Sequence, residues 1–376
     1  MTDGIIFSSL HDDAIPELTR ERTMASLPFA CRYRLIDFPL SAMVNAEIHT
    51  VYVVAQRNYQ SLTDHLGSGK DWDLARRSGG LKIMTPYSNA FAGNALPLFN
   101  SRLEALKSIA HTVFNLTSDY VVLADCDGIC NINLTEMIAQ HAKSGADITI
   151  AVKNMELTPD RAAHAVVIES NGDGRITGAL VRPTRLTGNH DVNLNIWVMS
   201  RRFLQNMVHD ALSKGLTSMS RDVLTRGASF AKFEIYRYEG YYAQFNSLTD
   251  YFASSMELLT NNDERNSIFN VKNRPIITKV RNSTPTKYSE NAVVKNSLIA
   301  DGCVIEGTVE NSLLFRGVKV GKNTVIKNSI LFQDTYTGNS VSLDCVIADK
   351  NVVIRDYRHL SGYETMPFCI GKGKMI

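Results

Sequence analysis

The tetrapeptide Lys295–Leu298 (KNSL) recurs as Glu310–Leu313 (ENSL) and as Lys327–Ile330 (KNSI), and Leu343–Val346 (LDCV) is a fourth, degenerate copy. The successive asparagines lie 15 and 17 residues apart, so each repeat spans about three six-residue units. Around these copies, pairs of Val, Ile and Leu alternate with Gly, Asn and Asp, and helical periodicity is absent. The spacing predicts a left-handed β-helix of the hexapeptide type, in which each coil stacks its apolar residues on the next coil.

An ordinary β-sandwich is the alternative for this segment, but the strands of a sandwich need no fixed repeat. The β-helix is predicted to cover residues 289–376. The preceding segment, 261–288, is polar and contains Pro275 and Pro285, so it is interpreted as a linker.

The first part of the chain, 1–260, alternates short apolar runs with helical patterns. Strands are expected at 4–7, 50–55, 119–124 and 147–152, and helices at 40–46, 102–111 and 134–144. This alternation predicts an α/β domain with a mostly parallel sheet covered by helices. Ligands bind such a sheet beyond the carboxyl ends of its strands, so the loops after Phe7 and Ala124 are expected to form the site.

The charge balance and the cysteines exclude several classes of function. The chain has 376 residues, of which 40 are Lys or Arg and 38 are Asp or Glu, which gives no footprint for nucleic acid or an anionic membrane. The cysteines form no C-x-x-C pair, so no metal or redox motif is predicted, and reduced thiols in a cytoplasmic protein are expected. No apolar run is long enough for a signal peptide or a membrane span.

Several stretches of the first domain carry a resemblance to a known family. They are Arg32–Ser41 (RYRLIDFPLS), Gly67–Leu74 (GSGKDWDL), Gly79-Gly80, Pro86-Tyr87, Asp222–Leu224 and Gly240–Tyr242 (GYY). These stretches closely resemble the ADP-glucose pyrophosphorylase family, whose members make ADP-glucose from ATP and glucose 1-phosphate for glycogen or starch. The resemblance implies a Rossmann-like nucleotidyltransferase domain with a mixed, mostly parallel sheet, followed by the β-helix. Fold alone does not give an activity, so the site residues must decide it.

The loop after the first strand departs from the family's pattern. In the family this loop reads Gly-Gly-x-Gly-Thr-Arg-Leu, and its glycines and arginine hold the phosphates. Here the same place reads Ser8–Ile15 (SSLHDDAI), without glycines and with Ala14 at the position of the arginine. Asp12 and Asp13 add negative charge, and two like charges about 4 Å apart repel by about 4 kcal/mol at an effective dielectric of 20. The loop is expected to reject ATP.

Other charge-handling positions of the family also differ here. Met24 stands where the family has a lysine, and the Gly-Thr-Ala motif is not recognisable around Ser101 and Arg102. The sugar-phosphate lysine of a Glu-Lys-Pro motif is matched by Arg182, which follows Val181 in place of the glutamate. Arg182 could still bind an anion.

The resemblance also places the family's two Mg²⁺-binding aspartates. The first is matched by Asp127, with Asp125 as the alternative, and the second falls on Gln244. A neutral amide is a poor substitute for a carboxylate at a hard-cation site. His11 could be a ligand, but it is interpreted as a loop residue. We therefore expect no catalytic residue and no metal site in this chain.

A basic run beside this loop contains the candidate effector-binding residues Arg22, Arg32 and Arg34. In the family, the positions that match Arg22 and Arg34 lie in a pocket for anionic effectors such as sugar bisphosphates or AMP. Arginine suits such a pocket because its planar fork makes paired contacts with phosphate. A solvated basic face is the alternative interpretation.

Together these features predict a regulatory, catalytically inactive subunit of glucose-1-phosphate adenylyltransferase. It would pair with a catalytic paralogue in a tetrameric assembly, and it would need no cofactor because Mg²⁺ would bind in the catalytic partner. An active nucleotidyltransferase with a divergent site is one alternative. A hexapeptide acyltransferase is another, but such enzymes usually need a histidine among the coils as a base, and residues 289–355 contain none.

Overall fold

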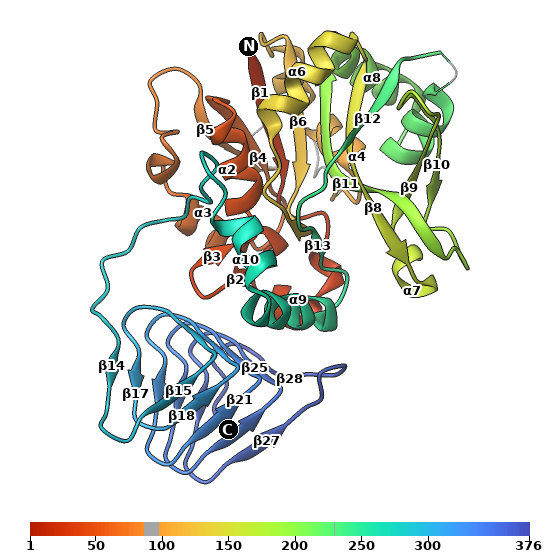
Figure 1. Ribbon diagram of the computed structural model, residues 1–376. Coiled ribbons are helices and arrows are strands. Elements are labelled where there is room, and N and C mark those ends of the chain that lie inside the picture. The colour runs from red at the N-terminus through yellow and green to blue at the C-terminus, as the bar shows by residue number, and fades with distance from the viewer. Residues whose placement is uncertain (86–97, 229) are drawn as a thin grey trace.

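The computed structural model describes residues 1–85, 98–228 and 230–376, and it consists of an N-terminal α/β domain and a three-sided β-helix (Figure 1). Pro86 and Tyr87, which contribute to the resemblance above, lie outside the described residues. In the part of the chain that is described, no helix has both the length and the apolar character needed to cross a bilayer.

The N-terminal domain is built on a nine-stranded sheet in the order β10-β9-β11-β6-β1-β4-β5; β8 also pairs with β11, and β12 pairs with β8. The bounds of these strands are β1 Thr2–Phe7, β4 Thr50–Val54, β5 Gly80–Met84, β6 Tyr120–Asp125, β8 Ile148–Leu157, β9 Val166–Ser170, β10 Ile176–Val181, β11 Gly188–Ser200 and β12 Phe233–Arg237. Strands β6, β1, β4 and β5 run parallel to one another, whereas β11 is antiparallel to β6, β8 and β9. The sheet is therefore mixed, and its four predicted strands are confirmed as β1, β4, β6 and β8.

Helices cover both faces of this sheet, because each face carries an apolar cluster. One cluster joins the sheet to α4, α5 and α8, and the other joins it to α2, α3 and α6. The bounds are α2 Asp37–Asn45, α3 Gln60–Leu66, α4 Arg102–Ser108, α5 Ala110–Phe114, α6 Leu134–Ser144 and α8 Arg201–Lys214. The prediction of one continuous helix over 102–111 is wrong: the chain leaves helical geometry at Ile109, which has φ −110°, and α5 begins after it.

The C-terminal part forms three parallel sheets of five short strands each, which stack as the three sides of a coil. The first sheet contains β14 Lys287–Tyr288, β17 Val304–Ile305, β20 Lys319–Val320, β23 Tyr336–Thr337 and β26 Val353–Ile354. The second contains β15 Val293–Lys295, β18 Thr308–Glu310, β21 Val325–Lys327, β24 Ser342–Asp344 and β27 His359–Ser361. The third contains β16 Leu298–Ile299, β19 Leu313–Leu314, β22 Ile330–Leu331, β25 Val346–Ala348 and β28 Phe368–Ile370. Their inward side chains form one apolar core along the coil, as the repeat predicts.

The segment 261–288, predicted to be a linker, is more structured than its polar composition suggested. Residues Asn262–Phe269 form helix α10, which follows α9 Leu248–Thr260. Ile277 then lies on the N-terminal domain, where its carbonyl accepts from Ser41 Oγ and Trp72 Nε1, both at 3.2 Å. The coil already begins at β14, so the segment that connects Ile277 to the coil is short.

An aromatic cluster joins the two parts of the molecule. Tyr251 of α9 stacks edge-on against Phe332 of the coil at 6.4 Å between ring centroids, and against Phe29 at 6.0 Å. Phe332 also contacts Phe315 of the neighbouring coil at 4.9 Å. All four rings are almost completely buried, in one apolar cluster that contains residues of both domains. Figure 1 shows the corresponding arrangement, with α9 directly above the coil.

Candidate functional site

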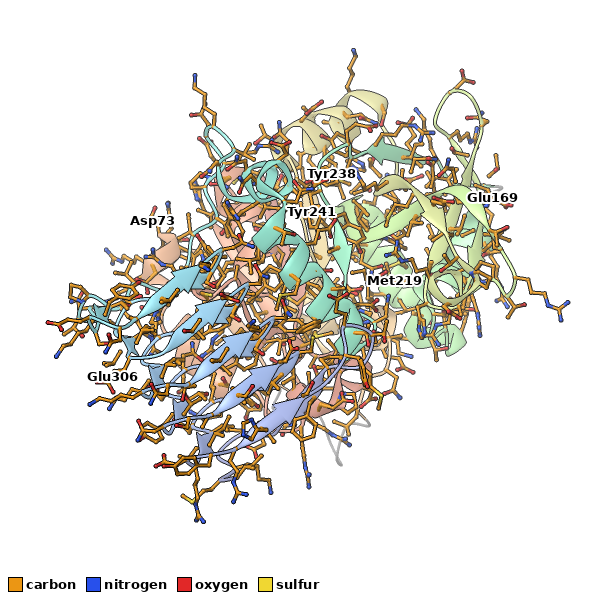
Figure 2. All side chains as sticks on the ribbon, turned by 60° about the horizontal axis from the view of Figure 1, so that its bottom comes forward. Asp73, Glu169, Met219, Tyr238, Tyr241 and Glu306 are labelled. Atoms are coloured by element: carbon orange, nitrogen blue, oxygen red, sulfur yellow. The ribbon has the colours of Figure 1, made fainter. Side chains whose placement is uncertain are left out.

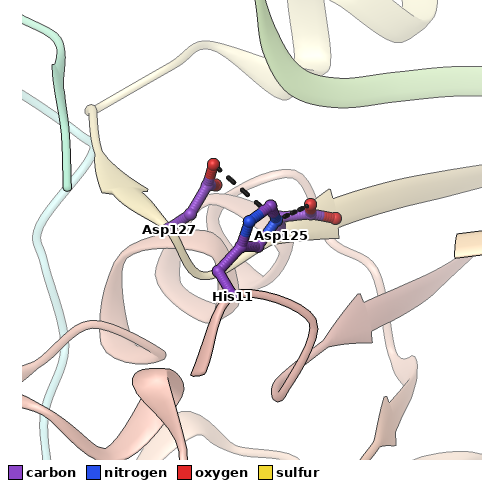
Figure 3. A group of neighbouring side chains, drawn as sticks. All are labelled: His11, Asp125 and Asp127. Atoms are coloured by element: carbon purple, nitrogen blue, oxygen red, sulfur yellow. Dashed lines mark hydrogen bonds and ion pairs between the residues drawn. The ribbon is translucent and has the colours of Figure 1, made fainter. Parts of the chain in front are cut away.

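The carboxyl ends of β1 and β6 bring the two predicted loops together. The strands pair in parallel, with Phe7 opposite Asp125, so His11 in the first loop lies beside Asp125 and Asp127 in the second. Figure 3 shows the three side chains meeting at this edge of the sheet. This is the place where ligands of parallel sheets bind.

Asp125 is held by two cationic side chains. Arg102, the first residue of α4, donates from Nε and Nη2 to the two carboxylate oxygens at 2.7 and 2.8 Å, which is a bidentate pair. His11 Nε2 lies 2.6 Å from Asp125 Oδ2. Burial alone would raise the pKa of Asp125, but Arg102 and His11 outweigh it and hold the pKa at about 2. Asp125 is therefore a permanently ionised carboxylate with its charge already neutralised.

Asp127 is held by neutral amides. Asn195 Nδ2 and Gln244 Nε2 both donate to Asp127 Oδ2, at 2.7 and 2.8 Å. Gln244 reaches this position because β13 Ala243–Gln244 pairs with β7 Gly128–Ile129. The structure thus joins two residues that the sequence analysis assigned to one site, Asp127 and Gln244.

His11 lies between the two aspartates, 3.8 Å from Asp127 Oδ2. Burial lowers the pKa of His11, but Asp127 and Asp125 more than compensate, so its pKa is raised. The raised pKa favours the imidazolium form, in which both ring nitrogens are donors. His11 therefore takes part in the site, contrary to its interpretation as a simple loop residue.

The three side chains His11, Asp125 and Asp127 bring their ligand atoms within 4.8 Å of one another, which is close enough to surround a cation. The donor set nevertheless does not fit Mg²⁺. That ion needs several oxygen ligands in octahedral geometry, whereas both oxygens of Asp125 are taken by Arg102 and His11. Two amide N–H groups also point at Asp127. The chain's own donors thus occupy both oxygens of Asp125 and Oδ2 of Asp127.

Asp12 ties the loop Ser8–Ile15 to the backbone at Met24. Its Oδ1 accepts from the backbone N–H of Met24 at 2.6 Å, which brings together two residues of the predicted degenerate site. Burial raises the pKa of Asp12 to about 7. Ala14 packs against the apolar cluster near the domain boundary, and Asp13 is exposed.

The remaining predicted residues lie elsewhere. Arg182 is exposed at the end of β10, and among the described residues no contact joins it to Asp125 or Asp127. Arg22 and Arg34 are buried, at 2% and 7% exposure, between the domains, whereas Arg32 is exposed.

The sequence analysis missed Arg102 as a partner of Asp125 and missed a cavity beside Gln244. The cavity measures about 590 Å³, and its lining includes Arg161, His164, Tyr241, Tyr242, Gln244 and Glu257. Tyr241 donates to Glu257 of α9 at 2.7 Å, so one wall is fixed to that helix. Figure 2 shows Tyr241 beside α9. Gln244 and the two tyrosines of the GYY motif, all singled out in the sequence, line this cavity.

Comparison with known proteins assigns both parts of the chain. The profile of the nucleotidyl transferase family matches residues 15–226, and that of the GlmU-like C-terminal hexapeptide matches residues 282–364, in agreement with the left-handed β-helix.

Whole proteins are similar as well. The glycogen biosynthesis protein GlgD of Bacillus subtilis (strain 168) is 33% identical over 98% of this chain and 95% of its own length, and GlgD of Geobacillus stearothermophilus is 35% identical over 98% and 96%. A glucose-1-phosphate adenylyltransferase of Clostridium botulinum is 31% identical over 83% of this chain and 80% of its own length. The chain therefore belongs to the ADP-glucose pyrophosphorylase (glucose-1-phosphate adenylyltransferase) family, among its GlgD-type members.

Proposed function

We propose that this chain acts in glycogen biosynthesis as a non-catalytic, regulatory partner of a glucose-1-phosphate adenylyltransferase subunit in the cytoplasm. The names of its relatives support the pathway, since they include glycogen biosynthesis proteins and adenylyltransferases. The arrangement around Asp125 and Asp127 supports the absence of catalysis.

The observation that carries the proposal is the occupation of both carboxylates by the chain's own donors. Nucleotidyl transfer develops charge on phosphate oxygens, and enzymes neutralise that charge with metal ions and with lysine or arginine side chains. Here both donor groups of Arg102 that reach the site are bonded to Asp125, so they do not face a phosphate. Gln244 donates an N–H group to Asp127 at the position where a metal would need a second carboxylate. Removing one charge-stabilising group already costs about 10²–10³ in rate.

A fold that keeps its domains without this chemistry can still support assembly and effector binding. We propose that both domains contribute to a tetrameric complex in which Mg²⁺ binds only in the catalytic subunit. Arg22, Arg32 and Arg34 would transmit an anionic effector signal to that subunit. A stable interface should bury at least about 1,000 Å².

One observation favours the alternative, an active transferase with a divergent site. The cavity of about 590 Å³ beside Gln244 falls within the size range of small-molecule sites. An open cavity permits binding, but it supplies no charge neutralisation at Asp125 or Asp127, so we propose binding without turnover.

The test is to purify the chain alone, the adenylyltransferase subunit of the same cell alone, and the two co-expressed. We expect that the chain alone releases no pyrophosphate from ATP and glucose 1-phosphate, that the two subunits co-elute in size-exclusion chromatography with light scattering, and that the complex has altered kinetics. The catalytic subunit alone, at equal concentration, is the control. The proposal fails if the chain alone turns over in the usual enzyme range of about 1–10³ s⁻¹, or if the subunits elute separately with unchanged kinetics.

A further inference from the structure

A buried ion pair crosses the boundary between the two domains. Arg22 of the N-terminal domain donates from Nη2 to both carboxylate oxygens of Asp349, at 2.8 and 2.7 Å. Asp349 lies in the coil, in the turn between β25 and β26, and both side chains are almost fully buried, at 3% and 4% exposure. Such a pair has lost most of its contact with water, so its neighbours must satisfy its remaining groups.

The neighbours of this pair are mainly basic, and the acidic partner of Arg34 is Asp37 of its own domain. Burial together with Arg34 and Arg22 lowers the pKa of Lys350 to about 7, and burial lowers the pKa of Arg34 to about 10. Arg22 Nη1 is buried and has no hydrogen-bond partner among the described residues. Arg22, Arg34 and Lys350 thus gather around one ion pair, and among the described residues one buried nitrogen of Arg22 is left without an acceptor.

The coil holds the Asp349 carboxylate in place. Asp349 Oδ1 accepts from the backbone N–H of Lys350 at 2.6 Å. The backbone of Asp349 is fixed as well, because its N–H donates to Ile370 O at 2.9 Å and its carbonyl accepts from Thr335 Oγ1 at 3.1 Å. The β-helix therefore presents a fixed anion to Arg22 of the N-terminal domain.

We propose that Asp349 is an internal substitute for a phosphate group: it occupies the cluster of Arg22, Arg34 and Lys350 and keeps that cluster closed to effectors. The inference rests on the proposed function only in assigning the cluster to regulation. A phosphate group brings nearly two charges and three acceptor oxygens, against one charge and two oxygens in a carboxylate. It would satisfy the free nitrogen of Arg22, which Asp349 leaves unsatisfied.

Displacement of Asp349 from Arg22 by a phosphate group has a structural consequence. Because Arg22 and Asp349 belong to different domains, a phosphate group that takes over Arg22 breaks a bond between the domains. Binding of the effector and docking of the coil against the N-terminal domain then compete, and each weakens the other by the same factor. An effector would therefore act by weakening the contact between the two domains.

The experiment compares Asp349→Asn with the unaltered chain, each purified alone, by calorimetric titration with inorganic phosphate. We expect at least about tenfold tighter binding in the variant, which corresponds to about 1.4 kcal/mol. Glu306→Gln is the matched control, because it removes a carboxylate from the same β-helix, and Figure 2 shows Glu306 on the side of the coil away from Tyr241 and α9. Its affinity should equal that of the unaltered chain.

A second substitution, Lys350→Met in the Asp349→Asn background, should reverse the gain. A sugar bisphosphate and a nucleoside monophosphate are titrated in parallel to identify which phosphate compound fits the cluster. Equal phosphate affinity in Asp349→Asn and the unaltered chain, or an unchanged gain after Lys350→Met, overturns the proposal.

Asp349→Asn leaves Arg22 without a partner and can be unstable. Phosphate must then raise its thermal unfolding temperature, since a ligand that binds only the folded state stabilises it. A variant that stays unfolded in tens of millimolar phosphate contradicts the substitution of phosphate for the carboxylate. No catalytic subunit is present in these measurements, so their outcome is separate from that of the proposed function.

Discussion

Arg102 is a permanent cation inside a buried site, and its removal should be costly. Breaking a buried ion pair on one side costs about 3–5 kcal/mol, because the remaining charge has no partner. Arg102 and Asp125 have side chains that are 11% and 1% exposed, so Arg102→Met should lower the free energy of unfolding by about that amount. Urea denaturation followed by tryptophan fluorescence measures it, since the Arg102 guanidinium lies 5.5 Å from the ring of Trp197.

Two controls test this explanation. Arg76→Met removes an exposed partner of Asp73 and should change stability by less than about 1 kcal/mol. The double variant Arg102→Met with Asp125→Leu should recover much of the loss, because a buried ion pair can be replaced by apolar groups. If the double variant is as unstable as the single one, the cost comes from packing and not from an unpaired carboxylate.

The sequence placed Asp127 and Gln244 in one site but missed the ion pair between Arg102 and Asp125. Asp127 and Gln244 were brought to one site by resemblance, and the structure places them 2.8 Å apart. Arg102 was recognised only as a departure from a motif, because an arginine at the start of a helix is usually solvated. Its contact with Asp125 depends on how α4 packs against β6, which no local pattern encodes.

Among the elements, the repeated asparagine of the coil has a conformational reason. Asn296, Asn311 and Asn328 have φ of 39°, 45° and 43°, in the left-handed region that asparagine tolerates better than most residues. Asn296 Nδ2 also donates to Asn311 Oδ1 at 2.7 Å, and Asn328 Nδ2 donates to Asp344 Oδ1 at 2.9 Å. The repeat was therefore visible in the sequence because these corners share one backbone geometry. The fourth copy was aligned one residue early, since Asp344 pairs with Lys327 and Cys345, with φ 52°, takes the corner position.

Asn328→Val should destabilise the coil by about 1–3 kcal/mol, because a β-branched residue is strained at positive φ. Asn328→Gly should cost less than Asn328→Val, since glycine adopts this conformation freely and loses only the bond to Asp344. Thermal unfolding followed by circular dichroism compares the two. Equal losses would show that the hydrogen bond, and not the corner conformation, determines the cost.

Helix α10 shows why the linker prediction was too long. Its residues are mostly polar, so composition favoured a loop. Its beginning did carry a signal: Asn261 Oδ1 accepts from the N–H groups of Asp263 and Glu264, which is the arrangement of a capping asparagine followed by acidic residues. Capping positions would have predicted this helix where composition did not.

The aromatic cluster should make the two domains unfold as one unit. Phe332 is fully buried and belongs to the coil, but it packs against Tyr251 of the N-terminal domain. Phe332→Ala should cost about 3–5 kcal/mol. Because both tryptophans of the chain, Trp72 and Trp197, lie in the N-terminal domain, their fluorescence should report the same lowered transition as circular dichroism of the coil.

Tyr336→Ala is the matched control, since this aromatic side chain of the same β-helix is 43% exposed and its loss should change stability little. Two separate transitions in Phe332→Ala, with tryptophan fluorescence unchanged, would show that the domains unfold independently. The contact between Tyr251 and Phe332 could not be predicted from the sequence. The two residues are far apart along the chain, and the sequence gives each the pattern of an ordinary core residue of its own domain.

The amides around Asp127 also constrain how this protein can evolve. Gln244→Asp, taken alone, would place another carboxylate beside Asp127 and remove a hydrogen-bond donor, so the change is unfavourable until a cation binds there. A cation in turn requires that Arg102 release Asp125, and the loop at Ser8–Ile15 would still lack its glycines. Each of these changes is harmful unless the others are already present. A metal-dependent active site is therefore hard to acquire by single substitutions from this sequence, whereas changes in partners and effectors do not meet this obstacle.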